Sequence, residues 1–182
     1  MVVALHQLHE RYRLDRLVIS TYQSVSGTGA AAVQQLFEER SGRHELKVYP
    51  HPIDLNCLPH GGDFLPNGYT TEEMKLVHET RKIFDAPDID ITATVVRVPV
   101  VGGHSESVNA TFHQSFDMKE VMEVLRSTPG VALVDDPSSN QYPMPIHAHH
   151  RDEVYVGRVR RDESHPSGLN LWIVADNLRK GA

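Results

Sequence analysis

Hydrophobic positions change period several times along the chain, which predicts strands interspersed with helices. Stretches rich in β-branched and apolar residues, bounded by glycine, proline and polar turns, favour strands. They cover residues 17–22, 89–101, 108–115, 131–134, 153–160 and 168–175. Residues 89–101 and 108–115 flank a Gly-Gly-His turn that begins at Gly102, so we expect these two strands to pair with each other in antiparallel fashion.

Helical periods appear in three segments. A glycine turn at residues 26–29 begins an Ala-rich helix through about residue 40, and we expect its buried side to carry Ala30, Val33, Leu36 and Phe37. A third helix is capped by Asp117 and continues to about residue 127. Together with the strands, these segments predict alternating elements of both kinds.

The second helix begins at Thr70 or Thr71 and ends before Pro87. Its first turn carries two glutamates, and Met74, Val77 and Ile83 recur on one side. Residues 47–69 contain four prolines, which disfavour a long helix, so we expect an ordered surface loop there.

These elements predict the α+β class: a mixed, mostly antiparallel sheet with helices packed on one face. Because a stretch such as residues 89–101 is apolar on both sides, the other face of the sheet also needs a cover. At 182 residues and 40% hydrophobic content, the chain is most simply one domain.

Charge and composition exclude several partners. The net charge of −6 comes without a basic stripe, which argues against nucleic acid, and no apolar run approaches the roughly 20 residues that span a bilayer. Residues 1–7 lack the features of a signal peptide. A single cysteine, Cys57, allows no internal disulfide and fits a cytoplasmic protein.

Arg97 and His104 are the strongest candidates for chemistry. A guanidinium binds a carboxylate with two parallel hydrogen bonds, whereas an imidazole accepts or donates a proton near neutral pH. Gly102 and Gly103 let the backbone between them turn and approach a ligand closely. A surface arginine and a capping histidine would give the same local pattern, so this spacing alone leaves both interpretations open.

Several motifs in order along nearly the whole chain resemble the C-terminal catalytic and dimerisation domain of aspartate-semialdehyde dehydrogenases. The fold that this resemblance implies is like the catalytic domain of glyceraldehyde-3-phosphate-type dehydrogenases, paired with a second copy as a homodimer. The matching segments are residues 20–27, 67–75, 97–99, 103–107, 135–137, 141–145, 156–158 and 176–182.

The resemblance implies reversible reductive dephosphorylation of L-aspartyl-4-phosphate to L-aspartate 4-semialdehyde with NADPH, through a thioester on a cysteine. This reaction belongs to the biosynthesis of lysine, methionine, threonine and diaminopimelate. Arg97 would bind the α-carboxylate of the substrate, and His104 would be the general acid and base. Glu72 would bind the amino group and Lys75 the phosphate. The residues alone favour an exposed ion pair between Glu72 and Lys75.

Four further residues acquire roles from the same resemblance. Gln23 would orient the thioester or the attacking group, while Ser26 and Gly27 would lie beside the nicotinamide. Asn177 would contact the nicotinamide amide. Without the resemblance, Gln23 is more simply a turn residue and Asn177 a helix cap.

The chain also departs from the family pattern. It contains no Rossmann domain with a glycine-rich phosphate loop, and the Asn-Cys-Ser/Thr motif of the nucleophile would fall just before Val2. We therefore expect residues 1–182 to be a domain truncated at both ends and inactive alone. We expect Cys57 to be a partly buried, inert thiol. The alternative is a non-catalytic dimerisation or binding module.

Two groups of histidines have spacings compatible with metal binding. One consists of His147, His149, His150 and Asp152, and the other of His51, His60 and Asp63. Neither has a cysteine ligand, and the resemblance involves no metal. We therefore expect solvated or interface loops and no metal site at these groups.

Overall fold

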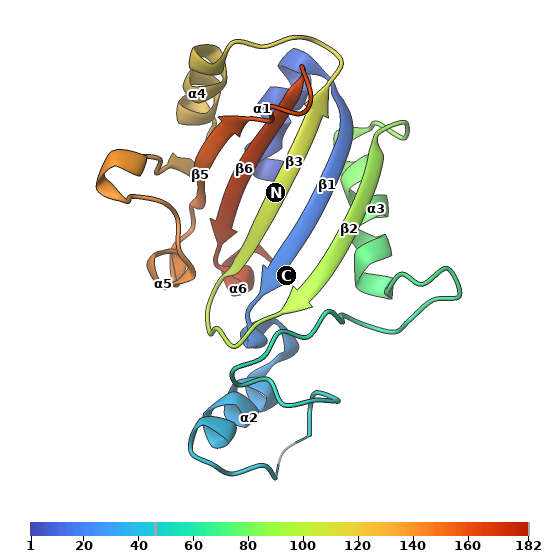
Figure 1. Cartoon of the computed structure of the whole chain (residues 1–182), viewed down its shortest axis with the longest axis vertical. Helices are drawn as coiled ribbons and strands as arrows, with labels where there is room; N and C mark the ends of the chain where they lie inside the picture. The colour runs from blue at the N-terminus through green and yellow to red at the C-terminus, as the bar shows by residue number, and fades with distance from the viewer. Residues whose placement is uncertain (46, 182) are drawn as a thin grey trace.

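The computed structural model describes residues 1–45 and 47–181, which form a six-stranded sheet with helices (Figure 1). The strand order is β2-β1-β3-β6-β5-β4, in which the β1–β2 and β4–β5 pairs are parallel and the other three pairs are antiparallel. The α+β class and the mostly antiparallel sheet are thus confirmed. The strands are β1 (Leu14–Gln23), β2 (Asp90–Arg97), β3 (His104–Phe112), β4 (Val131–Leu133), β5 (Val154–Arg161) and β6 (Gly168–Ala175).

The predicted pairing of β2 with β3 is wrong, because β1 lies between them. Strand β2 runs parallel to β1, with Gln23 opposite Arg97, and β3 runs antiparallel to β1 on its other side. Residues 98–103 cross the end of β1, where the Val98 N–H donates to the Gln23 carbonyl at 2.9 Å. Six residues that include Pro99 are too long for a tight hairpin turn, so they can pass over the intervening strand.

Three long helices cover one face of the sheet, as predicted (Figure 1). Sequence reasoning misses the first of them, α1. No described helix is long and apolar enough to cross a membrane. The helices are α1 (Val2–Tyr12), α2 (Ala30–Arg40), α3 (Thr71–Phe84), α4 (Met118–Ser127), α5 (Pro145–Ala148) and α6 (Asn177–Lys180), with short 3₁₀ turns at Val25–Thr28 and Pro137–Ser139.

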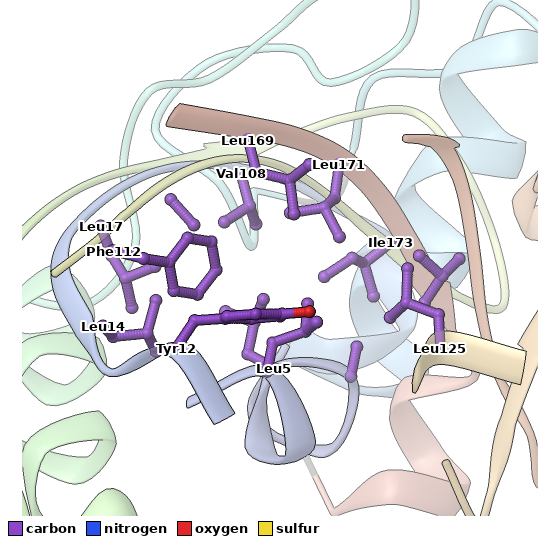
Figure 2. Close-up of a cluster of buried hydrophobic side chains, with 14 of the residues drawn as sticks. Leu5, Tyr12, Leu14, Leu17, Val108, Phe112, Leu125, Leu169, Leu171 and Ile173 are labelled. Atoms are coloured by element: carbon purple, nitrogen blue, oxygen red, sulfur yellow. The ribbon is translucent and has the colours of Figure 1, made fainter. Parts of the chain in front are cut away.

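The main hydrophobic core lies between this face of the sheet and helices α1, α3 and α4 (Figure 2). Leu5 from α1, Leu17 from β1 and Leu125 from α4 are each fully buried in it. Helix α3 presents Val77 to the protein interior as expected, but Ile83 is exposed. Burial of apolar surface at about 25 cal/mol per Å² makes this layer the main source of stability.

Helix α2 lies beyond the end of the strands, and its predicted buried side is partly wrong. Phe37 is 54% exposed, whereas the polar residues Gln35 and Glu39 are buried. Their side-chain oxygens accept four backbone N–H groups from residues 48–54, at 2.7 to 3.2 Å. The unpaired amides of the Pro-rich loop need acceptors, so polar side chains occupy this side of the helix.

The other face of the sheet is less apolar than the sequence suggests. Thr92 and Thr94 of β2 alternate with the core residues and point away from the core. Tyr22 is 39% exposed on the same side, and its ring lies 5.4 Å from that of Trp172. This face therefore carries hydroxyl groups and aromatic rings together.

Candidate active site

A pocket of about 290 Å³ lies where β1 and β2 end and β3 begins. Residues from the four strands β1, β2, β3 and β6, from helices α3 and α6 and from the turn after β1 line it. Seven of the eight site residues predicted from sequence are among them: Gln23, Gly27, Glu72, Lys75, Arg97, His104 and Asn177. The eighth, Ser26, is bonded to one of the lining residues, as described below.

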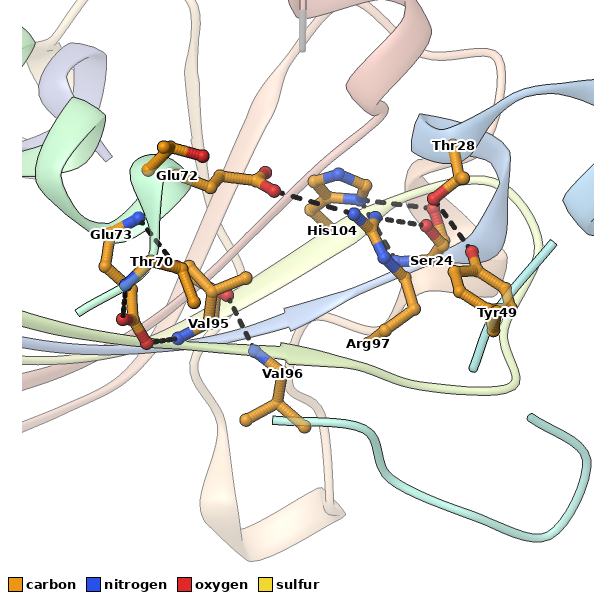
Figure 3. A network of polar contacts seen from close by, with 12 residues as sticks. Ser24, Thr28, Tyr49, Thr70, Glu72, Glu73, Val95, Val96, Arg97 and His104 are labelled. Atoms are coloured by element: carbon orange, nitrogen blue, oxygen red, sulfur yellow. Dashed lines mark hydrogen bonds and ion pairs between the residues drawn. The ribbon is translucent and has the colours of Figure 1, made fainter. Parts of the chain in front are cut away.

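Arg97 is buried at the end of β2, with only 6% of its surface exposed. Leu58 from the Pro-rich loop pairs with its backbone through two hydrogen bonds of 2.8 and 2.9 Å. Its Nη1 donates to the Ser24 carbonyl at 3.0 Å, and its Nη2 lies 3.7 Å from the Glu72 carboxylate (Figure 3). The guanidinium is thus fixed in place and still has donors available for an anion.

His104 is held by the chain that follows β1 (Figure 3). The Ser24 backbone N–H donates to its Nδ1 at 3.1 Å, which places the ring proton of the neutral imidazole on Nε2. Burial lowers the pKa of His104 from 6.5 to about 4, and the positive charge of Arg97 adds to this effect. At neutral pH the ring is therefore uncharged and donates through Nε2.

Gly27 lies against the side chains of both Arg97 and His104 and leaves no room for a side chain of its own. A Cβ atom at this position would lie 3.0 Å from Nε2 of His104 and 3.1 Å from Nη1 of Arg97. Both distances are shorter than ordinary contacts, so any larger residue would displace one of the two groups. The imidazole and the guanidinium therefore approach the same point of the pocket wall.

A network of polar groups behind this wall fixes the orientation of Asn177. Its Oδ1 accepts hydrogen bonds from Ser24 Oγ, Ser26 Oγ and the Gly103 N–H, each at 3.1 Å. All three donors bond to the oxygen, and the buried Nδ2 group has no partner among the described residues. Helix α6 is capped by Asp176, so the interpretation of Asn177 as a helix cap is wrong.

Glu72 and Lys75 come from the first two turns of α3, which begins with a capping box. They line the same pocket but do not pair with each other in an ion pair. Glu72 points toward Arg97, whereas Lys75 lies 4.0 Å from Glu79 and is largely exposed. The predicted ion pair is therefore not formed, because Glu72 contacts Arg97 and Lys75 contacts Glu79 instead. The Lys75 ammonium remains near the pocket opening.

Three buried polar atoms within the described residues have no hydrogen-bond partner, and all three belong to residues that line this pocket. They are the donors Arg97 Nε and Asn177 Nδ2 and the acceptor Gln23 Oε1. Leaving such a group unpaired costs about 1–3 kcal/mol. A ligand with both acceptor and donor groups would supply the partners that these three atoms lack.

Cys57 is exposed and is not among the residues that line the pocket. The expectation that it is partly buried is wrong. Its neighbour Leu58 pairs with the edge of β2 and faces inward, so the side chain before it faces outward. The described lining of the pocket thus contains no thiol.

Five polar residues at the site are missed by sequence reasoning. Thr21, Glu79, Glu106 and Lys180 line the pocket, and Ser24 holds His104 from behind. Glu106 lies two residues from His104 on one strand, so the period of 2 places both on one face and could have identified it. Ser24 acts through a backbone N–H, for which the sequence carries no signal.

Comparisons with known proteins agree with this geometry. Residues 5–180 match the family described as semialdehyde dehydrogenase, dimerisation domain. The aspartate-semialdehyde dehydrogenase of Aquifex aeolicus is 46% identical over 188 residues, which cover 100% of this chain and 55% of that protein. The chain thus spans about half the length of the curated relatives it matches.

Solved structures give the same result. The aspartate semialdehyde dehydrogenase II of Vibrio cholerae complexed with ASA has a TM-score of 0.94 and 42% identity, and it covers 100% of this chain and 55% of its own. The aspartate semialdehyde dehydrogenase of Candida albicans with NADP shares the fold at a TM-score of 0.70 and 22% identity, over 97% of this chain and 49% of its own. The fold is thus the glyceraldehyde-3-phosphate dehydrogenase-like C-terminal fold. This chain belongs to the semialdehyde dehydrogenase family, in which it matches the dimerisation domain.

Proposed function

We propose that this chain is the substrate-binding and dimerisation part of an aspartate-semialdehyde dehydrogenase. The complete enzyme would convert L-aspartyl-4-phosphate to L-aspartate 4-semialdehyde with NADPH. The observation that carries this proposal is the convergence of three unpartnered buried polar atoms, on Gln23, Arg97 and Asn177, on one pocket. An amino-acid substrate with a carboxylate and a carbonyl group offers complementary partners for such atoms.

Arg97 is the proposed anchor for the α-carboxylate of the substrate. Its guanidinium has an unused Nε donor, and the burial of Arg97 reduces the screening by water that would weaken a charged hydrogen bond. Glu72 lies beside it and is proposed to bind the α-amino group. Lys75, at the pocket opening, is proposed to attract the phosphate, because its exposed ammonium needs little rearrangement.

His104 is the proposed acid and base. With the proton on Nε2, it donates a hydrogen bond to a substrate oxygen as negative charge develops there. To accept a proton from a thiol at Nε2, the ring must instead carry its own proton on Nδ1. The Ser24 N–H then loses its acceptor, and Ser24 Oγ, 3.1 Å from Nδ1, accepts from the ring in its place. Gln23 is proposed to orient the reacting carbonyl group.

The proposed cofactor is NADP, which the Candida albicans structure is described as containing. The nicotinamide end fits the part of this pocket that Ser26, Gly27 and Asn177 form. Gly27 leaves space for a close approach, and the free Nδ2 of Asn177 can donate to a carboxamide oxygen. When bound, the cofactor supplies the hydride, while these residues hold and orient its ring.

A homodimer is the proposed assembly. The sheet face opposite the core carries Tyr22 and Trp172, and helices α1, α3 and α4 do not pack against it. Large aromatic rings next to hydroxyl groups are suited to an interface that is partly apolar and partly hydrogen-bonded. A second copy of the chain would cover both rings.

The proposed function is tested by comparing the 182-residue chain with a fusion to the N-terminal part of the Aquifex aeolicus relative. The chain alone should show no phosphate-dependent reduction of NADP with aspartate semialdehyde, because its pocket offers no thiol. The fusion should show it. A fusion that folds, binds NADP and remains inactive would refute the proposal and favour a non-catalytic binding module.

A further inference from the structure

The fold brings together two histidines and an aspartate at one position outside the pocket. One potential ligand atom from each of His149, His150 and Asp176 lies within 4.8 Å of the others. The sequence groups both histidines with Asp152, but that carboxylate is bonded to the Arg179 guanidinium instead. Asp176 is 26 positions away from His150 in sequence, so only the tertiary structure reveals this cluster.

The backbone at His150 explains how two consecutive side chains come to lie on the same side. His149 is extended, with φ −59° and ψ 130°, and in a continuing strand the next side chain would point to the opposite side. His150 instead adopts a left-handed conformation with φ 64°, which costs a non-glycine residue about 1–2 kcal/mol. The two imidazoles consequently stack, with their centroids 3.7 Å apart.

Asp176 supplies a carboxylate that is fixed in place. Its oxygens accept hydrogen bonds from the backbone N–H groups of His150, Leu178 and Arg179. The residue is buried, and the His150 N–H donates to its Oδ2 at 2.6 Å. Since each oxygen has two lone pairs, the one that receives this single bond keeps acceptor capacity.

We propose that His149, His150 and Asp176 form a site for a divalent transition metal ion of the zinc class. Two imidazole nitrogens and one carboxylate oxygen are a ligand set that Zn²⁺, Co²⁺ and Ni²⁺ accept, with water at the remaining positions. Entry is from the solvent side, because His150 is exposed and His149 is half-buried. The imidazoles must turn out of their stacked arrangement so that both nitrogens point at the ion.

The site would be linked to the pocket through two contacts. The ring of His149 lies against Gly102, at the turn that leads into β3, and a Cβ there would lie 2.4 Å from its Nδ1. Asp176 caps the helix on which Asn177 lies. An ion would therefore stabilise the pocket wall without touching the proposed substrate. The site stands independently of the proposed function.

The test is titration of the metal-free chain with Zn²⁺ by calorimetry and with Co²⁺ by visible absorption. We expect one ion per chain and a higher Tm with Zn²⁺. His150→Gly removes a ligand and also relieves the left-handed strain, so the fold should be kept while affinity falls at least about tenfold. Asp176→Asn should weaken binding as well, with far-UV circular dichroism as the check on folding.

His147→Ala is the matched control, because His147 is exposed on the preceding helix and lies outside the cluster. It should bind the ion as the unchanged chain does. Equal affinity of the His150→Gly chain and the unchanged chain would overturn the proposal. So would an equal loss in the His147→Ala chain, or the absence of any saturable binding by the unchanged chain.

Discussion

Arg97 and His104 lie on strands that do not touch each other, yet both side chains approach the position where Gly27 lacks a Cβ. Arg97 ends β2 and His104 begins β3, while β1 runs between these strands and leads into the turn that contains Gly27. The functional pair is therefore assembled by three strand ends at one edge of the sheet.

Gly27→Ala is expected to impair the pocket without unfolding the chain. The backbone at Gly27 is not in the left-handed region, so alanine causes no backbone strain, but its methyl group would lie about 3 Å from both functional side chains. In the completed fusion, kcat/KM should fall at least about tenfold, corresponding to roughly 1.4 kcal/mol. Steady-state kinetics with a matched Tm measurement checks this, and unchanged kinetics would contradict the described packing.

Arg97→Ala and His104→Ala should separate binding from chemistry in the same fusion. Loss of the guanidinium should raise KM for aspartate semialdehyde by roughly a hundredfold, because a buried charged partner is removed. Loss of the imidazole should lower kcat by about 10²–10⁴-fold. If His104→Ala left kcat unchanged, the proposed proton transfer would be wrong.

His104 should titrate far below an ordinary histidine. Since its pKa is about 4 when folded and 6.5 as a model value, the unfolded chain binds a proton first as pH falls. Stability should therefore decrease between about pH 6.5 and pH 4, by no more than about 3 kcal/mol from this group. Urea unfolding at several pH values measures the slope, and imidazole NMR measures the pKa.

His104→Gln is the control for this pH dependence. Its unfolding free energy should vary less over the same pH range, although burial also lowers the pKa of His9 and keeps part of the slope. Identical slopes in the two chains would show that His104 is not held neutral. In the fusion, a thiolate beside the ring should raise the pKa, because opposite charge favours the imidazolium.

Cys57→Ser should leave the activity of the fusion unchanged within twofold. The thiol is exposed and outside the described lining of the pocket, so it contacts none of the reacting groups. Parallel kinetics of both proteins tests this. Turnover by the chain alone that disappeared with Cys57→Ser would assign Cys57 the role of nucleophile and refute the proposal above.

Leu5→Ala should destabilise the chain by about 2–5 kcal/mol, because Leu5 is fully buried between α1 and the sheet. Val3→Ala on the same helix is the matched control, since Val3 is 37% exposed. Its effect should stay within about 0.5 kcal/mol. Urea unfolding of both variants measures the difference, and equal losses would mean that α1 is not part of the core.

Local patterns predicted most elements but not how they pair. The capping residues Thr70 and Asp117 marked two helix starts correctly, since a cap acts on neighbouring amides. The strand order depends on whether another strand lies between β2 and β3. The length of the segment that connects these two strands along the chain does not show that β1 does so. Helix α1 was missed although its buried positions, Leu5, Leu8 and Tyr12, recur at helical spacing.

The sequence motifs predicted which residues would lie together in the pocket. They did not predict the hydrogen bonds that hold these residues in place. Ser24 and Asn177 are 153 positions apart, and their hydrogen bond exists only because the turn after β1 meets the start of α6. Likewise, Gln35 and Glu39 are buried although their polarity predicts exposure. The Pro-rich loop supplies backbone N–H donors to their side chains, and no periodic pattern reveals these donors. Polar contacts between distant segments are the part that sequence reasoning could not supply.

Helix α2 and the Pro-rich loop form their own small hydrophobic cluster, around Leu36 and Ile53, which shares no residue with the main core. Such a lobe can open locally while the sheet remains intact, at a free energy below that of global unfolding. Gly27 lies at its base, so each opening would briefly dismantle one wall of the pocket. Amide hydrogen exchange should thus be faster in α2 than in β1, and the lifetime of the lobe would limit the lifetime of the assembled pocket.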